Sequence, residues 1–205
     1  MASSNNLRVL TPGFLCSGTD CVTVRETDDV IDCIIEPEKD SMTTLHFNFP
    51  ENVSKKKYTI EVNFSAINAV LHIYGLYQLR DNQFADIKTT INHLVPQCES
   101  KQIWRGVLED ASKAIFEGKI IVHPNAQKTN AQLSNKNLLL SDNADINTKP
   151  TLEIYADDVK CSHGATVGFL DQDALFYLRS RGIDENRARE ILVQAFIDEI
   201  RFPPL

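Results

Sequence analysis

Long apolar runs are missing from this sequence. The longest, Ala69 to Tyr77, contains His72 and Gly75 and falls far short of the ~20 residues that a helix needs to cross a bilayer. The first residues carry one early base, Arg8, and lack the apolar core of a secretory signal. We therefore expect a cytoplasmic protein that does not span a membrane.

Positive charge is also scarce. The chain has 21 Lys and Arg against 28 Asp and Glu, which gives a net charge of −7 at pH 7. A broad nucleic-acid-binding surface depends on clustered Lys and Arg, so this balance argues against one. The one basic run, Lys55 to Lys57, follows Asn52 and Ser54 and is interpreted as a solvent-exposed turn.

The five cysteines form no C-x-x-C motif. An odd number of cysteines in a chain without a secretory signal favours free thiols over a disulfide framework. Cys16 and Cys21 make a C-x4-C, which does not complete a zinc or iron–sulfur site by itself. Phosphate loops, G-x-S-x-G elbows and H-E-x-x-H motifs are absent as well, so we assign no catalytic residue on the strength of a motif.

Alternating apolar residues predict β-strands in the first half of the chain. The segment 43–49 places Leu45 and Phe47 on one face and His46 on the other, which predicts a solvent-exposed histidine. The run 69–77 is apolar on both faces and predicts a buried strand. Residues 1–20 are polar, and we expect irregular structure there.

From residue 86 onward the apolar runs are shorter and are separated by Asn, Asp and Gly. Six asparagines lie between 125 and 147, and asparagine favours turns because its side chain bonds to nearby backbone groups. Trp104, the only tryptophan, is assigned to packing. Because no Asn-Gly hairpin signal occurs, stacked coils of a parallel β-solenoid fit the pattern better than a sandwich, although no strict repeat is visible.

A helical pattern replaces the strands near the end of the chain. Asp171 is predicted to cap a first helix, Gly182 to end it and Asp184 to cap a second. The apolar stripe of the second helix consists of Ala188, Ile191, Leu192, Ala195 and Phe196. We expect the stripes to pack on the open end of the solenoid, or in part to receive a partner. The chain then divides into a solenoid core, 1–168, and a helical domain, 169–205.

Only one place in the sequence sets a thiol and an imidazole two residues apart. If the segment 159–166 is extended, Cys161 and His163 project on the same side with their Cα atoms roughly 6.6 Å apart. Both are suitable ligands for iron–sulfur chemistry, whereas a small buried thiol and a hydrogen-bonded histidine are the structural alternative. Since a cluster needs about four protein ligands, the others would come from elsewhere in the chain or, more simply, from a second subunit.

Two other functions are compatible with the same region. Solenoid enzymes that act on acidic polysaccharides place carboxylates and bases on an exposed face, and Asp157, Asp158 and Lys160 could do so. On a strand, however, Asp157 and Asp158 alternate, so only one could share a face with Lys160, and solvated strand-end carboxylates explain them more simply. A homodimeric binding module with no role in cluster chemistry is the third hypothesis.

Several motifs extend across residues 100–200. They are Gly118-Lys119-Ile120 through Gln127-Lys128-Thr129, Asn137-Leu138-Leu139-Leu140-Ser141, Thr148-Lys149-Pro150, Leu152-Glu153-Ile154-Tyr155, Asp157-Asp158-Val159-Lys160-Cys161-Ser162-His163-Gly164-Ala165-Thr166, and Ala174 through Gly182. Together they resemble the SufB/SufD scaffold family of iron–sulfur cluster assembly. The Lys-Cys-Ser-His-Gly-Ala-Thr form is similar to the SufD branch.

The resemblance implies a right-handed parallel β-helix followed by a small helical domain. It implies a non-catalytic subunit that works with a SufB-like scaffold and a SufC-like ATPase, the latter docked on the C-terminal helices. His163 would contribute a ligand to a transient iron–sulfur cluster at the SufB–SufD interface, with Cys161 as the second candidate. A homodimer of the isolated chain is a further expectation. Family members usually carry an additional N-terminal helical region and a longer solenoid, so this chain is either a compact variant or a truncated form.

Overall fold

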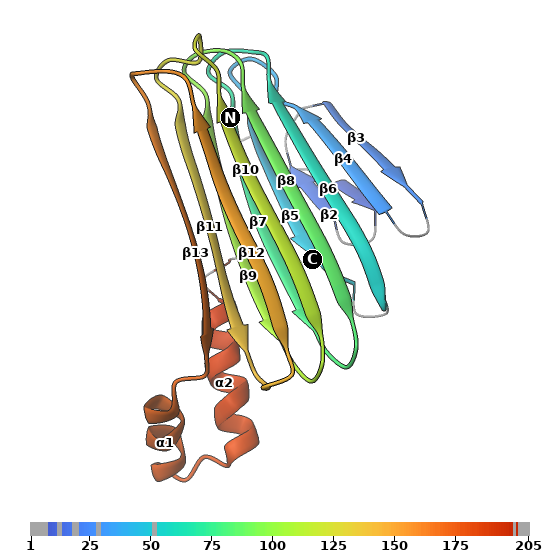
Figure 1. Ribbon diagram of the computed structural model, residues 1–205, viewed down its shortest axis with the longest axis vertical. Helices are drawn as coiled ribbons and strands as arrows, with labels where there is room; N and C mark the ends of the chain where they lie inside the picture. Colours follow the sequence, from blue (N-terminus) through green and yellow to red (C-terminus); the bar gives the residue numbers. More distant parts are fainter. Residues whose placement is uncertain are drawn as a thin grey trace, which may run out of the picture.

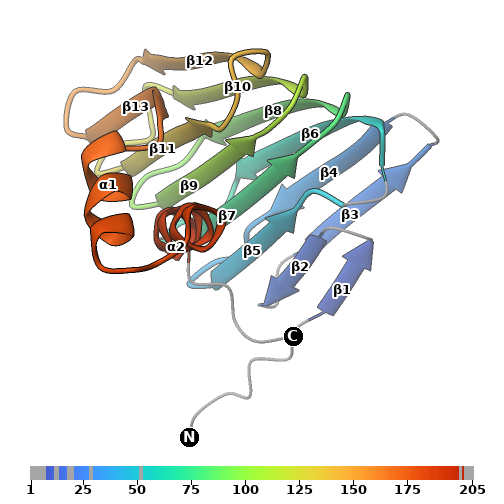
Figure 2. The same ribbon diagram turned by 90° about the horizontal axis from the view of Figure 1, so that it is seen from below.

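The fold is a β-solenoid with two helices on its side. The computed structural model describes residues 8–11, 14–17, 21–27, 30–50, 53–198 and 200. Two sheets lie face to face, and the chain alternates between them to make about five stacked coils (Figures 1 and 2). The predicted fold class, a mainly β solenoid followed by C-terminal helices, is confirmed.

The elements have the following bounds. In spatial order, the seven-stranded sheet contains β1 (Arg8–Thr11), β2 (Phe14–Ser17), β5 (Met42–Asn48), β7 (Val70–Leu79), β9 (Glu99–Leu108), β11 (Asn130–Leu139) and β13 (Lys160–Phe169). The six-stranded sheet contains β12 (Asp145–Ile154), β10 (Lys113–Val122), β8 (Phe84–His93), β6 (Lys55–Phe64), β4 (Val30–Glu36) and β3 (Cys21–Glu26). The helices are α1 (Gln172–Ser180) and α2 (Glu185–Ile197).

Strand pairing is parallel through the body of the solenoid. Lys55, Phe84, Lys113 and Asp145 follow one another in register on neighbouring strands, which corresponds to a coil of about 30 residues. Pairing is antiparallel only at the start of the described chain, where β1 pairs with β2, β2 with β5 and β3 with β4. The expectation of irregular structure over residues 1–20 is therefore wrong for β1 and β2.

The core lies between the two sheets. Leu45 and Phe47 point inward, as their alternation predicts, and are fully buried. Trp104 of β9 is fully buried too, so its assignment to packing is confirmed. Gly75 of β7 stands in register with Trp104, and a Cβ added at Gly75 would overlap the indole ring. The single tryptophan fits because its neighbour has no side chain.

Aspartate residues shape the corners that join β7 to β8 and β9 to β10. Asp81 and Asp110 adopt positive φ angles of 54° and 57°, a conformation that a short polar side chain tolerates. The two corners stack, since Asp81 N donates to Asp110 Oδ2 at 2.9 Å. Ser112 Oγ closes the second corner by donating to Glu109 O at 2.7 Å. Asp rather than Gly therefore repeats the turn from coil to coil.

Two sequence predictions for the early strands are wrong. His46 was expected in solvent, but it is buried on the outer face of β5, where its ring stacks on Tyr74 with centroids 5.5 Å apart. The basic run at 55–57 is not a turn, because it begins β6. Lys56 points inward there and pairs with Glu26 at 3.1 Å. Contacts with other strands explain both differences, since Tyr74 of β7 covers His46 and Glu26 of β3 pairs with Lys56.

The later strands are longer than the short apolar runs predict. From β10 to β13 each strand has ten residues. Asn135 and Asn137 were expected in turns, yet they lie inside β11 with their side chains in the core. Polar residues here continue the strand because hydrogen bonds inside the solenoid satisfy them.

Both helices begin where the sequence predicts. Asp171 caps α1 by accepting from Asp173 N and Ala174 N, and Asp184 caps α2 by accepting from Arg187 N. Gly182 follows α1 with a φ of 84°, which confirms its role in ending the helix. Within the part of the chain that the structure describes, no helix is long and apolar enough to cross a bilayer.

Helix α2 packs on the side of the solenoid and not on its open end. Figure 2 shows α2 beneath β7 and β9, with α1 beside β11 and β13. Ile197 of α2 packs with Leu76 of β7 and Val107 of β9, and Val193 and Phe196 join this cluster. The predicted capping of the open end by the stripe of α2 is therefore wrong. Ala195, which the stripe included, is exposed.

Candidate functional site

The open end of the solenoid is formed by its last two strands. β13 pairs with β11 and β12 pairs with β10, and each lies at the end of its sheet among the described strands. All other strands of the later coils have neighbours on both sides. Unpaired strand edges are a template for pairing with another chain. The last coil is thus the place where the solenoid can be continued.

The two edges differ in their backbone groups. On β13, Lys160 N donates to Thr129 O of the preceding coil at 2.9 Å. Because successive residues of a strand alternate in direction, the N–H and C=O groups of Cys161, His163 and Ala165 then point to the open side. β13 contains no proline, so this row of donors and acceptors is complete.

The edge of β12 is interrupted. Tyr155 N donates to Val122 O at 2.8 Å and Asp145 N to Ser112 O at 3.1 Å, so odd-numbered residues face β10. Pro150 therefore faces the open side, where it supplies no N–H. Proline at this position protects an edge, as it does in other sheets. Of the two edges, β13 is better suited to accept a further strand.

The structure places Cys161 and His163 on the inward face of β13. They stand in register with Ala131 and Leu133, whose side chains are buried in the core. In-register residues of parallel strands project on the same face, so the thiol and the imidazole both point over the last layer of the core. Cys161 is half-buried and packs against that layer, whereas His163 is exposed. Their assignment as ligands stays a prediction.

Burial raises the pKa of the Cys161 thiol above its ordinary value, and a hydrogen bond with the backbone of Ala131 lowers the pKa in part. A thiol ligates a metal as the thiolate, so binding at Cys161 would release a proton.

The other described thiols are deeper in the core. Burial raises the pKa of Cys33 to about 12, with a smaller contribution from Cys16. Burial also raises the pKa of Cys98, whose Sγ donates to Ala66 O at 3.3 Å. Within the ranges that the structure describes, no group of three or more His, Cys, Asp or Glu side chains could hold a metal ion. The structure does not describe the side chain of Cys21, so its C-x4-C spacing with Cys16 remains a sequence observation.

The acidic residues before β13 do not form a paired site. Asp157 and Asp158 lie in the bend between β12 and β13 and not on a strand, so their predicted alternation is wrong. Both are exposed, and the backbone of Asp158 holds the corner by accepting from Lys128 N at 2.6 Å. This arrangement favours a structural role for the bend over polysaccharide chemistry.

Exposed aromatic side chains that were not predicted lie at the other end of β13, where the strand leads into α1 (Figure 1). Phe176 and Tyr177 of α1 have 72% and 57% of their surface exposed, and Phe169 at the end of β13 has 64%. Phe176 and Tyr177 lie off the stripe that buries Leu175. Two adjacent aromatic residues outside a helix's apolar stripe were the signal in the sequence.

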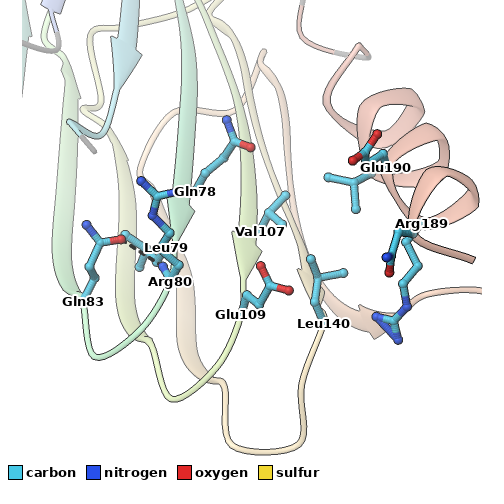
Figure 3. Close-up of a pocket in the computed structure, with 11 residues that line it drawn as sticks. Gln78, Leu79, Arg80, Gln83, Val107, Glu109, Leu140, Arg189 and Glu190 are labelled. Atoms are coloured by element: carbon cyan, nitrogen blue, oxygen red, sulfur yellow. Dashed lines mark hydrogen bonds between the residues drawn. The ribbon is translucent and has the colours of Figure 1, made fainter. Parts of the chain in front are cut away.

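A cleft lies between α2 and the solenoid. Its volume is about 520 Å³, and it separates α2 from the ends of β7 and β9 (Figure 3). Arg80 and Glu109 line it from the solenoid, and Arg189 and Glu190 from the helix. Its walls carry both signs of charge and do not select one class of ligand.

These features define a class of protein: an open-ended β-solenoid that displays a thiol and an imidazole on its last strand and has two helices beside it. The family model described as "SUF system FeS cluster assembly, SufBD core domain" matches residues 34–196. The chain therefore belongs to the SufBD core family of the SUF system.

Curated relatives agree with this family. The chain is 41% identical over 144 residues to the iron–sulfur cluster assembly protein SufD of Escherichia coli (strain K12), covering 70% of this chain and 34% of that protein. It is 47% identical over 122 residues to the SufBD family protein slr0076 of Synechocystis, covering 60% and 27%. It is 42% identical over 150 residues to the chloroplastic protein ABCI7 of Arabidopsis thaliana, covering 72% and 32%. The chain spans about a third of the length of these relatives.

Proposed function

We propose that the chain is a SufD-like scaffold subunit that contributes ligands to a transient iron–sulfur cluster at its interface with a SufB-like partner. The observation that carries the proposal is the position of Cys161 and His163 on the inward face of β13, an edge strand that has a neighbour on one side only. Family membership and the names of the relatives support a role in iron–sulfur cluster assembly. The chain supplies ligands and surface, and no catalytic group.

The partner adds a strand to β13. The outward N–H and C=O groups of Cys161, His163 and Ala165 offer the hydrogen bonds, and Pro150 makes the neighbouring edge of β12 less suitable. In the absence of that partner, a second copy of the chain could occupy the same edge and form a homodimer. A strand added to β13 would bring its own side chains beside the two candidate ligands.

The cluster is completed by the partner. Iron–sulfur clusters are held by about four protein ligands, and this chain offers two at its open end. Burial raises the pKa of the half-buried Cys161 thiol, so iron would have to compete with a proton there, which suits a site that binds its cargo transiently. His163, being exposed, is accessible to the partner in the free chain.

A SufC-like ATPase docks on the C-terminal helices in this proposal. Phe176 and Tyr177 of α1 are exposed while Leu175 and Ala188 hold the two helices in the fold. Aromatic side chains exposed on a rigid helix are typical anchors of protein interfaces. The ATPase and the SufB-like partner would then occupy different elements.

A proline on the edge of β13 tests the proposal. Ala165→Pro removes one N–H that points to the open side and leaves the bonds to β11 in place, as natural Pro150 does on β12. The Ala165→Pro variant is expected no longer to co-purify with a SufB-like protein. The Ala165→Val variant retains the N–H and is expected to co-purify with it. Equal binding by both variants would contradict strand addition at β13.

A further inference from the structure

A closed chain of hydrogen bonds runs through the core of the last coils. Its members are Tyr77 of β7, Asn135 and Asn137 of β11 and Thr148 of β12. Tyr77 and Asn135 are fully buried, and Asn137 has 3% of its surface exposed. This network lies in the core between the two sheets.

Each polar atom of the network has a specific partner. Tyr77 Oη donates to Asn137 Oδ1 and accepts from Asn135 Nδ2 at 2.8 Å. Asn135 Oδ1 accepts from Asn137 Nδ2 and, at 3.0 Å, from Thr148 Oγ1. Asn137 Nδ2 also donates to the carbonyl of Thr166 on β13 at 3.1 Å. The network therefore joins the interior strands β7 and β11 to both strands of the open coil.

A glycine makes this reach possible. Gly106 of β9 stands in register between Tyr77 and Asn137. A Cβ at Gly106 would overlap both the ring of Tyr77 and Oδ1 of Asn137. The tyrosine side chain crosses over β9 because this position is empty, so three residues on three strands form one structural unit.

The hydrogen bonds of this network add little to the free energy of folding, and their main effect is to fix the positions of the strands that they join. A satisfied hydrogen bond between neutral buried groups adds only about 1 kcal/mol, because the same groups bond to water in the unfolded chain. Apolar side chains of similar shape would serve as well in stability alone. Directional bonds instead hold β12 and β13, each of which has a single neighbouring strand, at a set distance across the core.

We infer that Asn135 and Asn137 are positioning residues for the open end, which hold β12 and β13 in the arrangement that directs Cys161 and His163 toward the partner. The inference rests on the proposed function for its last step. Asn135 and Asn137 stand in register with Ala165 and Val167, directly after His163 on the same face of β13. Through Thr166 O and Thr148 Oγ1 they fix both sides of the opening.

Amide hydrogen exchange on the isolated chain tests the positioning role without any partner. Tyr77→Phe keeps the ring and removes the hydroxyl, and Thr148→Val removes the hydroxyl at nearly constant volume. Each variant is expected to speed exchange of the bonded amides of β12 and β13 by about tenfold, the effect of losing a buried hydrogen bond, and to leave β6 and β8 unchanged. Thr148→Ser, which keeps the hydroxyl, should exchange like the wild type.

Thr89→Val is the matched control. Thr89 of β8 is fully buried in the same core, and its Oγ1 has no hydrogen-bond partner within the described residues. This substitution should leave exchange in β12 and β13 at the wild-type rate. Unchanged exchange in Tyr77→Phe, or faster exchange in every strand, would overturn the inference, since the network would then be dispensable or merely structural.

A second readout connects the network to the site. Iron and sulfide retained with a SufB-like partner should fall several-fold in Tyr77→Phe and Thr148→Val and remain in Thr148→Ser and Thr89→Val. Faster exchange with full retention of iron would overturn the link to the site. If the wild-type chain retains no iron with any partner, the proposed function fails, while the exchange rates still decide whether the network positions the open coil.

Discussion

His93 should make the protein less stable in mild acid. Its side chain is fully buried at the end of β8, stacked on Phe64 with ring centroids 4.5 Å apart. Nε2 lies 2.9 Å from Ser100 Oγ, and Nδ1 has no hydrogen-bond partner among the described residues. Burial lowers the pKa of His93 to about 4, because the charged imidazolium would lose its hydration.

The size of the effect follows from the two states. In the unfolded chain the histidine has a pKa near 6.5, so between about pH 6.5 and pH 4 the unfolded state binds the extra proton. Stability is therefore highest above this window and falls as the pH is lowered through it. Between neutral pH and about pH 5 the expected loss from His93 alone is about 2 kcal/mol. Burial lowers the pKa of His46 too, which adds to the loss in the same direction.

Chemical denaturation at several pH values measures this loss, with His93→Gln as the comparison. Glutamine can still bond to Ser100 but does not titrate. The decrease in unfolding free energy between neutral pH and about pH 5 should be smaller in the variant by about 2 kcal/mol. Equal pH dependence in the two proteins would refute the assignment of a neutral, desolvated histidine at this position.

Three further outcomes are expected. Gly75→Ala should lower the unfolding free energy by ~1–3 kcal/mol in denaturation experiments, because the added methyl group overlaps Trp104, and Trp104→Leu in the same chain should recover part of the loss. Asp171→Ala should lower stability by about 1 kcal/mol and speed amide exchange in the first turn of α1, because two N–H groups lose their acceptor. His163→Ala should change stability by less than about 0.5 kcal/mol, because the side chain is exposed; unchanged stability in the first two variants, or a large loss in the third, would contradict these assignments.

Local alternation was enough to predict the inward faces of the early strands, whereas the solenoid was favoured by short apolar runs separated by Asn, Asp and Gly. Leu45 and Phe47 are buried as alternation requires, and Asp171 and Asp184 cap helices because a carboxylate satisfies free N–H groups wherever a helix starts. The burial of His46 was not predicted because it depends on a contact that is distant in the sequence. Its burial depends on Tyr74, which lies one coil away and cannot be located without the strand register.

The later coils were harder to predict because their strands pair in a regular register without repeating the same residue types. From their neighbours in the sequence, Asn135 and Asn137 are predicted in turns. They can be buried because Tyr77 hydrogen-bonds with them and Gly106 leaves space for that contact, and both of these residues lie on other strands. The position of α2 likewise depends on Leu76, which the sequence places far from the helix.

For the site, the spacing of Cys161 and His163 identified the pair, and alternation placed both on one face of β13. Their location on the last strand of a sheet follows from the strand order, which no local pattern reveals. The exposed Phe176 and Tyr177 were visible as aromatic residues off the helix stripe, but their exposure depends on where α1 lies beside the solenoid.

The iron and sulfide held by the chain in complex with a SufB-like protein test the central claim most directly. Wild-type chain and His163→Ala would be purified with the partner without oxygen, with His123→Ala as a control imidazole at a corner between β10 and β11. We predict equal amounts of partner in all three complexes and loss of bound iron and sulfide only in His163→Ala. A His163→Ala complex that holds as much iron and sulfide as the wild type would contradict the assignment of the open end as a cluster site.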